Sequence, residues 1–73
     1  MTSNQINWEL IINNMNHDLI RSFATGNISG DDFYQEARYD GVSPEVRRLL
    51  RSRGVTEARS LARKALRRRG VQV

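Results

Sequence analysis

Residues 41–54 read GVSPEVRRLLRSRG, a helix-forming segment with a glycine at each end. Ser43 is a favoured helix N-cap residue, and Pro44 takes the first helical position, where its missing N–H leaves no hydrogen bond unmade. Gly54 stands just past the end, where a left-handed backbone is common. The apolar residues recur at the spacing of one helical face: Val46, Leu49 and Leu50. The stretch therefore predicts a short helix between two glycine corners.

Similar signals precede this segment. An apolar stripe over residues 8–24 predicts a helix that ends before Gly26, and the Asn-rich residues 13–16 mark a kink or a break in it. Ser29, followed three residues later by an acidic side chain, predicts the start of a second helix. That helix is expected to end at Gly41.

After Gly54, Thr56 predicts the cap of a fourth helix that ends at Gly70. The predicted fold class is therefore all-α, a small compact domain of about four short helices with a basic C-terminal helix. Within it, residues 1–56 form an acidic helical core, and residues 57–73 an Arg-rich helix that we expect to dock weakly and to be mobile. The expected core joins nine large apolar side chains: Trp8, Ile12, Met15, Leu19, Phe23, Phe33, Val46, Leu49 and Leu50.

Length and composition restrict the function. A chain of 73 residues buries only about 60% of its unfolded surface, which leaves room for one modest core and no deep substrate cavity. It has no cysteine and a single histidine, His17, so thiolate nucleophiles, disulfides and His/Cys metal sites are excluded. We therefore expect no enzyme, no cofactor and no metal. The longest apolar run, residues 10–12, is far shorter than the roughly 20 residues of a membrane span, and a cytoplasmic location is expected.

Charge divides the chain into two halves. Residues 1–46 contain seven acids and two arginines, whereas residues 47–73 contain nine arginines and Lys64 against Glu57 alone. This asymmetry indicates an electrostatic partner for the basic half, most simply the phosphate backbone of RNA or DNA, although a solvated face is the simpler alternative. The candidate nucleic-acid-binding residues are Arg47, Arg48, Arg51, Arg59, Arg63, Lys64, Arg67, Arg68 and Arg69.

The charge is densest in the predicted last helix. Arg59, Arg63 and Arg67 recur every four residues and predict one continuous basic stripe. Arg67, Arg68 and Arg69 then cluster at the helix end, where cations also compensate the helix dipole. Three adjacent arginines exceed what the dipole requires, so phosphate contacts are favoured. Because these residues lie near the end of the chain, we expect their joint replacement by Gln to leave the fold intact.

Residues 33–52 resemble a helix-turn-helix module. In that family a small residue lies on the first helix, glycine makes the turn, a hydrophobic residue follows, and Ser or Thr opens the recognition helix. Ala37, Gly41, Val42 and Ser43 match those places, and Leu50 suits the inward position of the second helix.

Two residues depart from that family pattern. Glu36 and Arg47 stand where the two helices usually bury aliphatic side chains. The resemblance implies base contacts from Pro44, Glu45 and Arg48, of which Pro44 has no hydrogen-bonding side-chain group. Two capped helices that meet at a glycine are also common in small helical domains, which is the alternative interpretation.

The chain as a whole resembles the small bacteriophage regulators that bind host RNA polymerase, of the Xanthomonas-phage antitermination type. The resemblance depends on the lack of cysteine, an Asn- and acid-rich front half, and the tail at residues 67–70. It implies docking near the RNA exit channel of the polymerase, inhibition of initiation and suppression of termination in the host cytoplasm. It assigns no individual binding residue.

Two functions are therefore expected as alternatives. In the first, the chain binds host RNA polymerase and places its Arg-rich helix near nucleic acid. In the second, it is a helix-turn-helix DNA-binding repressor or an excisionase-like protein. A DNA reader usually dimerises on two half-sites, whereas a polymerase-docking factor acts as a monomer. The sequence shows no heptad seam, so we favour a monomer on the polymerase.

Overall fold

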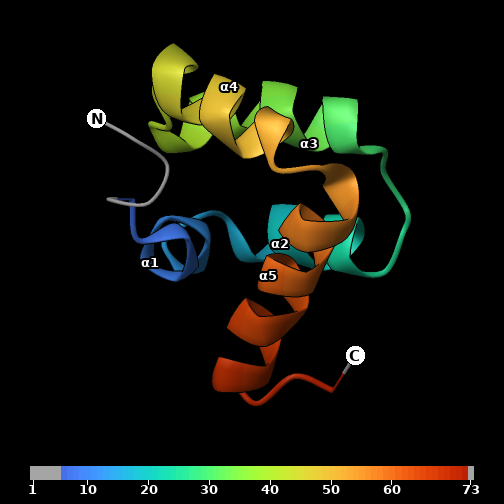
Figure 1. The fold of residues 1–73 in the computed structure, drawn as a ribbon. Helices are drawn as coiled ribbons and strands as arrows, with labels where there is room; N and C mark the ends of the chain where they lie inside the picture. Colours follow the sequence, from blue (N-terminus) through green and yellow to red (C-terminus); the bar gives the residue numbers. More distant parts are fainter. Residues whose placement is uncertain (1–5, 73) are drawn as a thin grey trace.

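In the computed structural model, which describes residues 6–72, every regular element is helical (Figure 1). The elements are α1 (Trp8–Asn13), α2 (His17–Ala24), α3 (Gly30–Glu36), the 3₁₀ helix η2 (Ala37–Asp40), α4 (Pro44–Ser52) and α5 (Val55–Arg68). The predicted all-α fold is confirmed. The serine caps are confirmed as well, because the hydroxyls of Ser29 and Ser43 each accept a hydrogen bond of 3.2 Å from the backbone N–H three residues on.

The apolar stripe over residues 8–24 forms two helices. α1 ends at Asn13 and α2 begins at His17. The side-chain oxygen of Asn16 accepts hydrogen bonds from the backbone N–H groups of Asp18 and Leu19, at 2.9 and 3.2 Å. Asparagine prefers such a cap to a helix interior, so the Asn-rich segment is a complete break and not a kink.

α5 begins before the predicted Thr56 cap, so that prediction is wrong. Gly54 is the N-cap residue, with a φ of +97° that favours glycine, and no side chain caps this helix. Val55 is already helical and packs against Gly30, where an added Cβ would lie only 2.7 Å from a Val55 methyl carbon. The predicted division after residue 56 therefore falls within the first turn of α5.

α5 packs mainly against α2 and α1, while α3 and α4 lie together at one end of the molecule (Figure 1). Its packed face is buried and consists mostly of small side chains: Ala58, Ala62, Ala65 and Leu66. Small side chains allow the helix axes to approach closely. In this structure residues 57–72 thus cover the core that the front half contributes, while their mobility stays a prediction.

The nine side chains expected in the core are all found there. Six of them are buried, and Leu19, Val46 and Leu49 are partly buried against them. The centre is a stacked pair, Phe23 and Phe33, whose ring centroids lie 4.0 Å apart with an 8° angle between the planes. Both rings are fully buried. This pair joins α2 to α3.

We expect Phe23→Ala to lower the free energy of unfolding by about 3–5 kcal/mol, because it removes a fully buried ring and leaves a cavity beside Phe33. That loss is comparable to the whole stability of so small a domain. Leu10→Ala, at a side chain that is 55% exposed, is the control and should cost much less. Urea denaturation followed by circular dichroism measures both, and equal losses would contradict the packing.

Candidate nucleic-acid interface

The basic residues at the C-terminal end of the chain do not all share one face of α5. Residues four apart on an α-helix are rotated by about 40° from one another, so a stripe with that spacing turns around the helix. Arg59 lies at the packed side: its guanidinium donates a 2.5 Å hydrogen bond to the Phe23 carbonyl and lies 4.6 Å from the Phe23 ring centroid. Arg63 is half-buried and Arg67 is exposed. The predicted stripe therefore changes from a core contact at Arg59 to a solvent-facing cation at Arg67.

The arginine cluster at the end of α5 is also divided. Arg69 folds back over the break between α1 and α2, where it donates hydrogen bonds to the carbonyls of Asn13 and Met15. Its second terminal nitrogen lies 3.2 Å from Nδ1 of His17. Carbonyls at a helix end have no partner within the helix, and Arg69 supplies one. This contact is structural, so Arg69 does not share the exposed setting of Arg67.

Lys64 and Arg68 face α1. Both pair with Glu9, at 3.6 Å for Lys64 and 2.5 Å for Arg68. Their side chains stay more than half exposed, at 56% and 59%. Exposed ion pairs contribute little to stability, so both cations can turn toward another anion at small cost.

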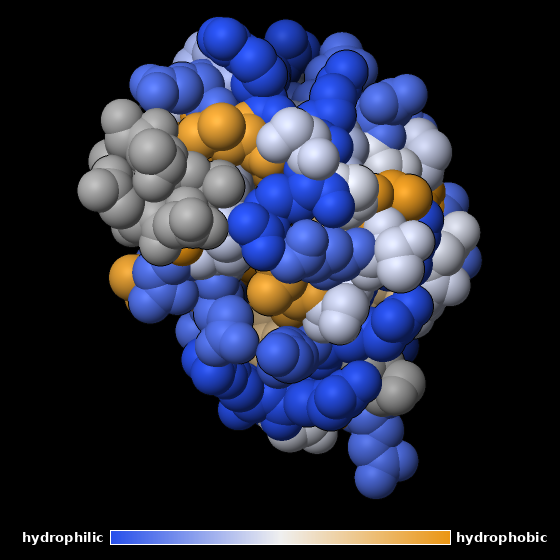
Figure 2. Space-filling view, viewed as in Figure 1, coloured by the Kyte–Doolittle hydropathy of each residue, from blue (hydrophilic) through white to orange (hydrophobic). Residues whose placement is uncertain are grey.

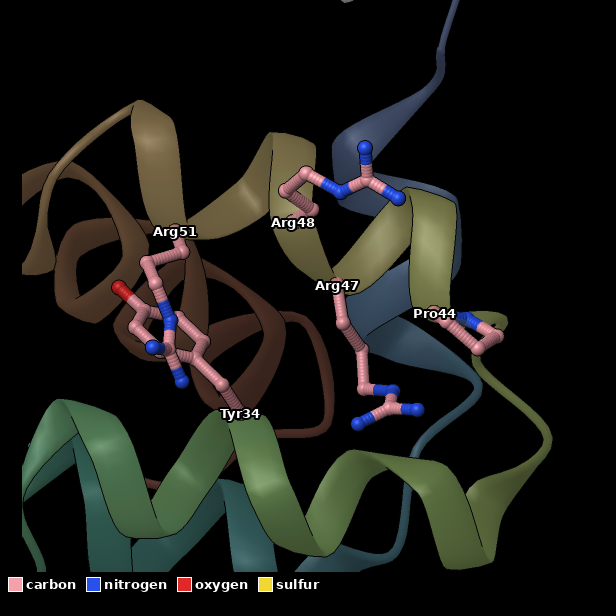
Figure 3. A pocket seen from close by; sticks show the side chains of 5 residues that line it. All are labelled: Tyr34, Pro44, Arg47, Arg48 and Arg51. Carbon is pink, nitrogen blue, oxygen red and sulfur yellow. The ribbon is translucent and has the colours of Figure 1, made fainter.

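The three candidate arginines of α4 line a solvent-open cleft between α3 and α4 (Figure 3). Its volume is about 220 Å³, and its other lining residues are Tyr34 and Pro44. Arg47 is half-buried, and its Nε donates a 3.2 Å hydrogen bond to the Val42 carbonyl. Arg51 lies over the Tyr34 ring and 3.7 Å from Asp31.

α3 and α4 form an antiparallel pair. Asp31, in the first turn of α3, pairs with Arg51, near the end of α4. Figures 1 and 3 accordingly show α4 running back alongside α3. Two antiparallel helices joined by a short turn form a helical hairpin. The resemblance of residues 33–52 to a helix-turn-helix module stays a prediction.

Among the nine candidates, three side chains make no hydrogen bond or ion pair within residues 6–72: those of Arg48, Arg63 and Arg67. Strongly hydrophilic side chains cover the lower part of the face in Figure 2, where Figure 1 places the end of α5, and others lie at its centre and along its top. The candidate interface is therefore the outer side of α5, formed by Arg63 and Arg67 with Lys64 and Arg68 beside them.

Two contacts were not predicted from the sequence. Arg53 pairs with Glu57 and lies 5.6 Å from the Trp8 ring centroid. Side chains four residues apart often pair on a helix, so the sequence could have predicted the contact between Arg53 and Glu57. Tyr34 lines the α3–α4 cleft, and no local sequence pattern predicts that position.

The described part of the chain holds no group of three or more His, Asp or Glu side chains that could bind a metal ion. None of its helices has the length and apolar character needed to cross a membrane. No protein-family model, curated protein or solved structure matches the chain.

We expect Arg69→Gln to destabilise the fold by about 1.5–3 kcal/mol, because it removes charge-assisted hydrogen bonds at the α1–α2 break. Arg67→Gln removes the same charge two residues away and should change stability by less than about 0.5 kcal/mol. Thermal unfolding of the two variants checks this difference. The joint replacement of residues 67–69 should therefore weaken the fold, contrary to the expectation from sequence. Identical melting of the two single variants would show that the Arg69 contacts contribute nothing.

The Tyr34 hydroxyl is buried and has no hydrogen-bond partner among the described residues. Burial raises its pKa above the ordinary 10.0, and the nearby Arg51 charge opposes this in part. As pH rises past about 10, the unfolded chain therefore loses the proton first and the native state loses stability.

We expect Tyr34→Phe to raise the free energy of unfolding at neutral pH by about 1 kcal/mol and to reduce its loss above about pH 10. Tyr39→Phe, on a ring that is 70% exposed, is the control. Denaturant titrations from pH 7 to 11 measure both effects. A Tyr34→Phe protein less stable than wild type would indicate that the hydroxyl is hydrogen-bonded in solution.

Proposed function

We propose that the chain is a small phage-type transcription regulator. It binds bacterial RNA polymerase as a monomer in the host cytoplasm and places the outer side of α5 against RNA or DNA phosphates. This contact serves to inhibit initiation, suppress termination, or both. The observation that carries the proposal is the pair Arg63 and Arg67, two cations of α5 that no carboxylate neutralises within residues 6–72.

Unpaired cations in a row repel one another, and a polyanion relieves that repulsion while releasing its own counterions. Lys64 and Arg68 extend the basic surface, since their exposed pairs with Glu9 exchange readily. No aromatic side chain lies on α5. These features favour contact with the phosphate backbone over stacking on bases.

The acidic half supports a protein as the second partner. The carboxylates of Asp18, Asp32 and Glu36 are exposed and have no ion pair within the described residues. They would repel a nucleic acid, whereas a basic protein surface would attract them. Bacterial RNA polymerase is proposed as that protein because of the resemblance of the chain to phage regulators.

The direct experiment is capture of purified bacterial RNA polymerase on the immobilised full chain, with and without nuclease treatment. Retention of polymerase subunits after nuclease supports docking through protein contacts. Loss of polymerase together with specific binding to a duplex site would favour the DNA-binding repressor or excisionase alternative.

We expect the double change Arg63→Gln with Arg67→Gln to weaken binding to nucleic acid and to make it less sensitive to salt. If both arginines neutralise phosphates, the slope of log affinity against log salt should fall by about 1.4 on single strands and about 1.8 on duplex. The measurement is fluorescence anisotropy on labelled RNA and DNA between 50 and 200 mM salt, a range over which phosphate contacts weaken strongly.

The matched control is Arg21→Gln with Arg38→Gln, which removes two charges from exposed positions outside α4 and α5. It should leave the slope nearly unchanged. An equal fall in both double variants would mean that only net charge matters. An unchanged slope in the α5 variant would show that Arg63 and Arg67 are solvated and contact no phosphate.

A further inference from the structure

The α3–α4 cleft is separate from the α5 surface and has its own charge pattern. Arg47, Arg48 and Arg51 all line its volume of about 220 Å³. Figure 3 shows the Arg47 guanidinium between the two helices and directed toward α3, Arg51 lying across the Tyr34 ring, and Arg48 at the rim, turned away from α3. Asp31 forms an ion pair with Arg51, at 3.7 Å. Three arginines therefore line one concave surface, and among the described residues only Arg51 of the three is paired with a carboxylate.

Arg47 is held in place for binding. Its Nε is occupied by the Val42 carbonyl at 3.2 Å, and its side chain is half-buried, so its position is fixed by the fold. Both terminal nitrogens remain as donors. A donor that is fixed before binding loses little conformational entropy when a ligand arrives.

Arg48 and Arg51 can contact the same anion as Arg47. Arg48 is exposed and has no partner within residues 6–72. Arg51 is 59% exposed, and its 3.7 Å pair with an Asp31 that is 83% exposed is weak. Both side chains are therefore free to turn toward an anion in the cleft.

The lining indicates which anion fits. Guanidinium forks match the oxygens of phosphate, often in pairs of parallel hydrogen bonds. Tyr34 is only 4% exposed, and Arg51 covers its ring, so no aromatic face is open to a base. A terminal phosphate carries a charge of about −1.5 to −2 with three acceptor oxygens, more than an internal diester offers. Three cations in one cleft suit the more highly charged group.

We propose that the α3–α4 cleft is a binding site for a terminal phosphate or polyphosphate group, supplied by the 5′ end of an RNA or by a free nucleotide. The site binds the phosphate group and makes no contact with the base. It goes beyond the proposed function, because it involves different residues from the α5 surface and a different part of the nucleic acid.

The first test is calorimetric titration of the full chain with inorganic tripolyphosphate. We expect one saturable site per chain. Arg48→Gln with Arg51→Gln should weaken it by about tenfold or more, since each change removes a charge-assisted hydrogen bond. Arg21→Gln with Arg38→Gln removes the same charge from exposed positions outside α4 and α5 and should weaken it by less than about threefold. Absence of saturable binding, or equal losses in the two variants, would overturn the proposal.

The side chains of Arg48 and Arg51 are both exposed, so the α4 double variant should fold, and its melting temperature verifies this. If the double variant does not fold, Arg48→Gln alone replaces it. The second test compares RNAs of one sequence that end in a 5′ triphosphate or a 5′ hydroxyl, beside a nucleoside triphosphate. A preference for the triphosphate RNA that the α4 variant loses assigns the site to RNA ends. Equal binding of the RNAs with saturable binding of the nucleotide assigns it to free nucleotides. Binding of neither phosphorylated ligand overturns the proposal.

The two proposals fail separately. If the α5 variant loses its salt dependence while tripolyphosphate finds no saturable site, the phosphate cleft is wrong and the interface on α5 stands. If the cleft binds tripolyphosphate while the α5 slope is unchanged, the cleft stands without the backbone contact.

Discussion

The position of the Phe23 ring is the constraint on which the rest of the structure depends. One side of it stacks on Phe33 of α3, and the Arg59 guanidinium of α5 lies over it at 4.6 Å. The same arginine binds the Phe23 backbone carbonyl. α2, α3 and α5 therefore meet at one residue. Since α5 also packs on α1, and α4 on α3, every helix is positioned directly or through one neighbour by this contact.

The arginines of this chain consequently serve two purposes that composition cannot separate. Arg59 and Arg69 bind backbone carbonyls of other helices, and Arg47 binds the carbonyl of Val42. Arg63 and Arg67 are not used in this way. A formal net charge of +4 thus understates the local charge on the outside of α5, while the count of nine candidate residues overstates the binding surface.

Local features of the sequence predicted the local features of the fold. Ser29 and Ser43 cap their helices because an N-cap bond forms between residues three apart, and helical periodicity identified the core side chains. The roles of Arg59 and Arg69 depend on partners 36 and at least 52 residues away, which helical periodicity does not report. The α3–α4 cleft likewise needs the antiparallel packing of two helices, which the turn residues at Gly41 do not predict by themselves. The sequence therefore predicted which residues belong to the candidate site but not how the fold arranges them in space.

The docking of α5 on α1 and α2 also has a consequence for biosynthesis. α1 and α2 leave the ribosome first, yet the Ala58–Leu66 face that covers them is translated last among the helices. Short isolated helices are marginal in water, so the early segments have little reason to persist as helices on their own. The nascent chain must keep its apolar stripe over residues 8–24 uncovered until α5 has emerged. Folding is then delayed until α5 has emerged, and the Asn-rich, polar break within that stripe limits the length of uninterrupted hydrophobic segment that is exposed to chaperones or to other nascent chains.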